Sequence, residues 1–256
     1  MVMQVEDVEI IDFKQTDLEN ATVIAGFPSI GLVSTIVANY LIDALGLEQI
    51  GALNSSQFPT LSVVHTGEPL SPVRIYGGTI DSGQKIVVFV SEFKPKPNLI
   101  NPLSTTILNW VKQKKCKLVI SPEGMVVEGK SCEDESAVDA YAIGSTENAR
   151  NMLQVKNIHQ FKNGIIAGVS GVLLNLGKQE NIDVISILSE AHPNYPDARA
   201  AASAINVIGN VIGVEINVGP LYDEAERIEK QLQKFHKQAK PMTSGAAPIP
   251  QPSMYG

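Results

Sequence analysis

Three carboxylates stand where acid–base chemistry could occur. Each follows an apolar run: Glu92 after 87–90, Glu123 after 118–120, and Glu190 after 184–188. If these runs are parallel strands, their carboxyl ends meet in the crevice where open α/β sheets bind ligands. Converging acids could carry out acid–base catalysis, or bind a ribose or a cation. Helix capping and helix-dipole contacts place acids at the same positions, so both interpretations stay open.

A glycine-bearing turn, Gly26-Phe-Pro-Ser-Ile-Gly31-Leu, lies between a predicted strand and a predicted helix. Phosphate-binding loops occupy such positions. The turn matches neither G-x-G-x-x-G nor the Walker pattern, and Pro28 removes a backbone N–H that a phosphate would need. We therefore expect close packing of helix on strand here.

A second turn, Gly168-Val-Ser-Gly171, partly resembles the G-x-S-x-G nucleophile elbow. The elbow requires a residue between the serine and the second glycine, and Ser170 is followed directly by Gly171. A helix N-cap is the role we predict for Ser170.

The sequence predicts no metal site and no cofactor. The two cysteines, Cys116 and Cys132, form no C-x-x-C pair. The histidines are scattered along the chain, at His65, His159, His192 and His236. Unpaired cysteines favour a reducing compartment, so we expect a cytoplasmic protein.

The elements that position these residues can be inferred from the sequence. Short β-rich runs alternate with helical patterns, which predicts a mostly parallel sheet covered by helices. The expected strands are 21–25, 85–91, 118–121, 164–169 and 184–188, with extra strands within 60–80 near a sheet edge. The expected helices are 28–46, 101–114 and 197–209, with Pro102 in the first turn of the second and Asp197 capping the third. We expect the runs 87–90, 118–120 and 165–169 to form adjacent buried strands.

The amino-acid composition of the chain limits the kinds of partner that it can bind. The chain has 256 residues, 44% of them hydrophobic, enough for one sizeable core. A net charge of -7 disfavours nucleic acid and anionic membranes. The chain start lacks a signal-peptide pattern, and no apolar stretch reaches the roughly 20 residues of a membrane helix.

The predicted organisation is a core over 1–219, a helix over 220–240 and a proline-rich tail over 241–256. The helix carries an apolar heptad seam formed by Leu221, Ala225, Ile228, Leu232, Phe235 and Ala239. An isolated helix of this length is marginal in water, so the seam must pack on its own domain or on a neighbouring subunit. We favour a subunit interface through Leu221, Ile228, Leu232 and Phe235. The tail has no charged side chain and is expected to be an extended tether or a frayed terminus.

Four blocks in a fixed order resemble the proteasome assembly chaperone 2 family, and its archaeal members above all. They are Gly26–Val33, Ile120–Met125, Gly168–Leu174 and Pro193–Ala201. The resemblance implies a three-layer α/β/α sandwich similar to nucleoside phosphorylases, no established enzymatic activity, and a role in assembling or activating the proteasome core particle.

The sequence ends in Met254-Tyr255-Gly256. This ending is similar to the hydrophobic–tyrosine–any-residue motif with which proteasome activators and chaperones enter pockets between α-subunits. The resemblance implies a homo-oligomer, with a tetramer favoured, that binds core-particle α-subunits through these three residues. The alternative is a nucleoside hydrolase- or phosphorylase-like enzyme that uses Glu92, Glu123 and Glu190.

Overall fold

A computed structural model describes residues 8–126 and 140–227. Its elements are β1 (Glu9–Asp12), β2 (Thr22–Gly26), η1 (Ile30–Leu32), α1 (Val33–Ala44), β3 (Glu48–Asn54), β4 (Val63–His65), β5 (Glu68–Leu70), β6 (Val73–Thr79), β7 (Lys85–Ser91), α2 (Pro97–Gln113), β8 (Leu118–Met125), β9 (Ala140–Gly144), α3 (Glu147–Val155), α4 (Gly168–Glu180), β10 (Val184–Glu190) and α5 (Ala198–Ile212). Residues 219–227 are also helical.

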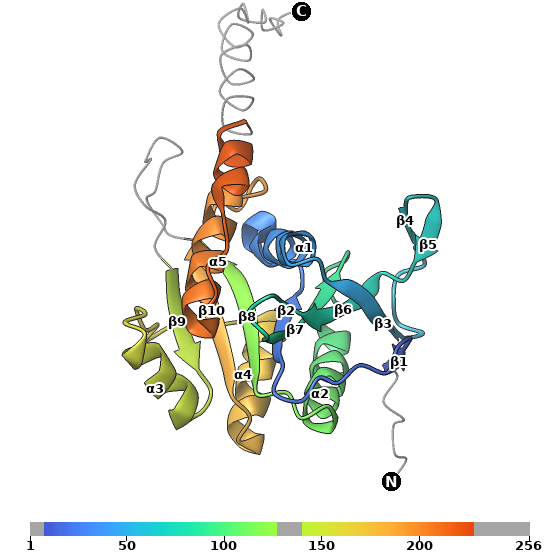
Figure 1. The fold of residues 1–256 in the computed structure, drawn as a ribbon, viewed down its shortest axis with the longest axis horizontal. Helices are drawn as coiled ribbons and strands as arrows, with labels where there is room; N and C mark the ends of the chain where they lie inside the picture. The colour runs from blue at the N-terminus through green and yellow to red at the C-terminus, as the bar shows by residue number, and fades with distance from the viewer. Residues whose placement is uncertain (1–7, 127–139, 228–256) are drawn as a thin grey trace, which may run out of the picture.

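An eight-stranded sheet in the order β1-β3-β6-β7-β2-β8-β10-β9 forms the middle of the molecule. The strands β7, β2, β8 and β10 are parallel and central. Antiparallel strands extend this centre on both sides, and Figure 1 shows β9 and β1 at opposite edges. The predicted α/β class with a parallel sheet at its core is confirmed.

Side chains of the central strands alternate between two hydrophobic clusters, one on each face of the sheet. In β2, Ile24 belongs to one cluster, whereas Val23 and Ala25 belong to the other. Helices α1 and α5 cover the first face, and α2 and α4 cover the second. Burial on both faces explains why these strands are almost continuously apolar in sequence. The three-layer sandwich predicted from the family resemblance is thus confirmed.

The strand expected at 164–169 is wrong. Residues 164–167 are irregular, Ile165 is 94% exposed, and α4 begins at Gly168. A short apolar run does not distinguish a strand from the start of a helix by periodicity alone. The runs 87–90 and 118–120 are buried strands as predicted, but β2 lies between them.

Two other expectations need correction. Helix α2 begins at Pro97, so Pro102 lies inside it and not in its first turn. The extra strands within 60–80 are present, but β6 lies between β3 and β7 inside the sheet; β4 and β5 form a separate hairpin, which projects from the core in Figure 1.

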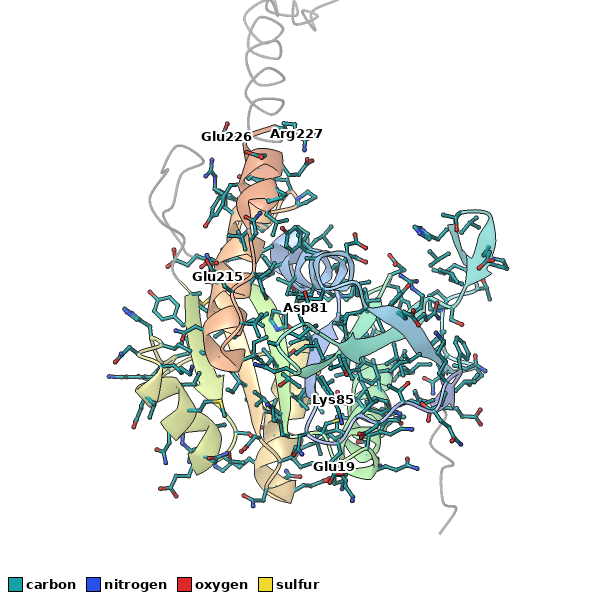
Figure 2. The ribbon with its side chains drawn as sticks, viewed as in Figure 1. Glu19, Asp81, Lys85, Glu215, Glu226 and Arg227 are labelled. Carbon is teal, nitrogen blue, oxygen red and sulfur yellow. The ribbon has the colours of Figure 1, made fainter. Side chains whose placement is uncertain are left out.

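The chain leaves the core through the helical residues 219–227. Leu221 and Ala225 are buried, at 6% and 4% exposure, in the cluster that α1 and α5 share. Figure 2 places Glu226 and Arg227 at the outer end of this helix. Across 8–126 and 140–227, no helix combines the length and the apolar character needed to cross a membrane.

Candidate functional site

A cavity of about 620 Å³ lies at the carboxyl ends of the central parallel strands. Most of its wall comes from four segments: 27–30 after β2, Lys94 and Pro95 after β7, 123–126 at the end of β8, and 165–169 at the start of α4. Pro97 and Ile100 of α2, Phe161 and Leu188 of β10 complete the lining. Of the three predicted carboxylates, Glu123 lines this cavity. The topology therefore brings together segments that are far apart in sequence.

Glycines allow these segments to approach closely. A Cβ atom at Gly26 would lie 2.3 Å from the Cβ of Ala38, so β2 and α1 pack in direct contact, as the sequence predicts for this turn. A Cβ atom at Gly124 would lie 2.1 Å from the carbonyl oxygen of Ile30. Because both positions lack a side chain, the turn after β2 can cross the end of β8 and form one wall of the cavity.

Glu123 is held by serine hydroxyl groups. The Ser170 hydroxyl donates to Glu123 Oε1 at 2.7 Å and is itself hydrogen-bonded to the Ser121 hydroxyl. Burial raises the pKa of Glu123 to about 7, while the hydrogen bond from Ser170, the charge of Lys94 and a hydrogen bond with Ser29 act in the opposite direction. The protonated form of the carboxyl is therefore far more favoured near neutral pH than it is for a carboxyl in water.

The predicted N-cap role of Ser170 is wrong. Ala167 is the N-cap residue of α4, and Ser170 lies inside the first helical turn with no exposed surface. Its hydroxyl positions Glu123 and does not reach the cavity as a nucleophile. Sequence reasoning also missed Ser29 and Lys94 as neighbours of Glu123, and Ser121 as the partner of Ser170. The available signal was Ser121, a polar residue inside an otherwise apolar strand.

The other two predicted acids do not line the cavity. Glu92 Oε1 accepts a hydrogen bond from Arg74 Nη2 at 2.5 Å, and the Arg74 side chain is only 5% exposed. Glu190 ends β10 opposite Met125 of β8. Among the described residues, Glu123 alone brings a carboxylate to the cavity lining, where the three-acid hypothesis requires three. The salt bridge gives Glu92 a structural role.

No group of three or more His, Cys, Asp or Glu residues within the described part of the chain could hold a metal ion. Burial raises the pKa of the Cys116 thiol to about 11, so this thiol stays protonated near neutral pH.

The predicted partner-binding residues Met254, Tyr255 and Gly256 lie outside the described residues, as do Ile228, Leu232 and Phe235 of the predicted interface. Leu221, from the same predicted interface, is described and packs in the core of its own chain.

Similarity to known proteins covers almost the whole chain. The PAC2 family model matches residues 23–236. PbaA of Pyrococcus furiosus, an archaeal homolog of proteasome-assembly chaperone, is 31% identical, with a TM-score of 0.78 over 92% of this chain and 99% of that chain. PbaB of the same organism, an archaeal proteasome activator, is 21% identical, with a TM-score of 0.79 over 91% of this chain and 100% of that chain.

An uncharacterized protein of Methanocaldococcus jannaschii is 27% identical over 240 residues, which are 94% of this chain and 95% of that protein. Family match, sequence identity and fold agree over the same region. The chain therefore belongs to the PAC2 family.

Proposed function

We propose that this protein is a proteasome assembly chaperone or activator that binds α-subunits of the core particle through Met254, Tyr255 and Gly256. The observation that carries the proposal is the 31% identity with PbaA over 92% of this chain. The similarity to PbaB, at 21% identity, supports the shared fold. The ending of the sequence adds a motif that suits a pocket between subunits.

The chemistry of the three residues supports this role. Met254 can fill an irregular apolar groove, and the ring of Tyr255 adds apolar area with a hydroxyl at its tip. The carboxylate of Gly256 can pair with a cation inside the pocket. Each contact is small and ordering the segment costs backbone entropy, so one ending binds weakly. Several endings on one oligomer raise the effective concentration and hence the avidity.

Absence of catalysis is part of the proposal. The Ser170 hydroxyl, which is hydrogen-bonded to Glu123, is fully buried, and Glu92 forms a salt bridge with Arg74. Ser170 is therefore not exposed as a nucleophile, and Glu92 does not join Glu123 as the second member of an acid–base pair. We expect no nucleoside turnover that depends on these carboxylates.

Surface plasmon resonance with immobilised cognate core particle tests the proposal. Deletion of 254–256, Tyr255→Ala, or one residue added after Gly256 should each reduce binding at least tenfold, because each removes part of the motif. Ser253→Ala is the matched control and should bind like the full chain. Circular dichroism verifies that every variant is folded.

The proposal is wrong if the truncated protein binds as well as the full chain. Peptide hydrolysis by the assembled core particle then separates the two forms of the function: an activator increases hydrolysis, whereas an assembly chaperone leaves it unchanged. We place both activities in the cytoplasm.

A further inference from the structure

We propose that the cavity at the carboxyl ends of β2, β7 and β8 binds a small organic acid with an apolar body, whose acidic head lies between Lys94 and Glu123. This function is separate from proteasome binding through 254–256. It concerns the folded core alone.

The cavity lies where open α/β sheets bind ligands. Its walls follow β2, β7 and β8, which are neighbours in the parallel centre of the sheet. The start of α4, the first turns of α2, Phe161 and Leu188 of β10 complete the lining. Open α/β sheets bind ligands at this edge, because successive strands send their connections to opposite faces and leave a crevice. Its volume of about 620 Å³ falls within the range of small-molecule sites, about 300–1,000 Å³.

The lining of the cavity is rich in apolar side chains. Ile30, Val126 and Ile165 line the cavity and are 39%, 46% and 94% exposed. Large apolar side chains gathered around an opening are typical of ligand-binding grooves. Enclosing an apolar ligand body here would remove this surface from water, at about 25 cal/mol per Å².

Charge around the cavity selects the head group. Among the described residues that line it, Glu123 and Lys94 alone carry ionisable side chains. Burial disfavours the charged form of Glu123, so the positive charge of Lys94 dominates when the carboxyl is protonated. A ligand carboxylate would receive an O–H hydrogen bond from Glu123 and the charge of Lys94. A cationic ligand would instead face Lys94.

Hydroxyl groups hold Glu123 in this position. Ser170 donates to Oε1 from the α4 side, and Ser121 fixes Ser170 from within β8. Ser29 contacts the carboxyl from the turn after β2 and accepts from the Ser34 hydroxyl at 2.8 Å. Since Ser170 and Ser29 contact the carboxyl from two different segments and Ser121 supports Ser170, the carboxyl is oriented before any ligand arrives.

Isothermal titration calorimetry on the full chain tests the head group with three probes that share one apolar body: phenylbutyrate, phenylbutylamine and phenylbutanol. The acid should bind at least tenfold more tightly than the alcohol, and the amine should bind most weakly. Affinity for the acid should fall about tenfold from pH 6 to pH 8, because binding requires protonated Glu123, whose pKa is about 7.

Variants separate the two polar groups. Glu123→Gln keeps an N–H donor, so it should still bind phenylbutyrate but lose the pH dependence. Lys94→Met should weaken binding of the acid at least tenfold and leave the alcohol unaffected. Lys96→Met is the matched control, because Lys96 lies two positions away and does not line the cavity.

The proposal fails if phenylbutyrate does not bind, if the amine binds most tightly, or if Lys94→Met and Lys96→Met bind the acid equally well. A pH slope retained in Glu123→Gln would also overturn it. Should Glu123→Gln not fold, the probe series and the lysine pair still decide the question.

Discussion

The environment of Glu123 destabilises the charged form of its carboxyl group. Burial raises its pKa to about 7 from an ordinary value of 4.5. The hydrogen bond from Ser170 stabilises the charged form but does not compensate for lost hydration. This imbalance links the stability of the fold to pH.

The free energy of unfolding should decrease as pH rises from about 4.5 to 7. In this window the unfolded chain releases the proton of Glu123 first, so the folded state binds more protons and loses stability with increasing pH. A shift of one pKa unit corresponds to about 1.4 kcal/mol of free energy of unfolding. Because the carboxyl keeps some contact with solvent at the cavity, we expect the full shift of Glu123 to change the free energy of unfolding by roughly 2 kcal/mol. Urea unfolding at pH 5 and at pH 8 measures the difference.

Glu123→Gln provides the control for this prediction. The amide does not titrate, so the difference between the two pH values should shrink by roughly 2 kcal/mol relative to wild type. Equal differences in wild type and variant would show that other groups cause the pH dependence.

Sequence reasoning identified Glu123 from its place after an apolar strand, but gave Glu92 the same standing. Arg74, which separates the two, comes from β6, an antiparallel strand whose place in the sheet was not predicted. A strand-end position predicts where a carboxylate points. It does not predict which partner the three-dimensional structure provides.

Elements buried on both faces were the ones that the sequence predicted best. Strand β7 has the bounds expected from its apolar run, and Asp197 caps α5 by accepting from the Ala200 N–H. The segment before α4 was misread as a strand, because its apolar residues line the cavity, with Ile165 almost fully exposed, and do not follow a core periodicity. In the sequence, a run of apolar residues that lines a cavity has the same pattern as a short buried strand.

Contact between β2 and α1 should make Gly26→Ala destabilising by about 2 kcal/mol, since the new Cβ atom would lie 2.3 Å from the Cβ of Ala38. Ala38→Gly removes that atom and costs about 1 kcal/mol as a helix substitution. The double variant should be more stable than Gly26→Ala alone. Thermal or urea unfolding of the four proteins measures this coupling, and simple addition of the two losses would contradict it.

At the scale of the whole molecule, the heptad seam begins as part of the core. Leu221 and Ala225 are buried in their own chain, which extends the predicted core beyond residue 219. Arg227 pairs with Glu224 at 2.5 Å near the outer end of this helix, where Figure 2 labels Glu226 and Arg227. Subunit contact through Ile228, Leu232 and Phe235 stays a prediction.

The double variant Ile228→Asp/Leu232→Asp should lower the mass measured by multi-angle light scattering from that of an oligomer to that of one chain. Burying an unpaired carboxylate in an apolar interface costs several kcal/mol per site, more than a helix seam of this length provides. Gln233→Asp/Gln238→Asp adds the same charge, with Gln233 on the polar face and Gln238 beside the seam but outside it, and should keep the oligomer. Because Leu221 and Ala225 are unchanged, both variants should retain a folded core.

The dissociated chain carries an intact ending, yet it should bind the core particle at least a hundredfold more weakly, since avidity is lost while each single contact persists. An unchanged mass in the seam variant would rule out the interface, and a lowered mass with unchanged proteasome binding would show that one ending suffices.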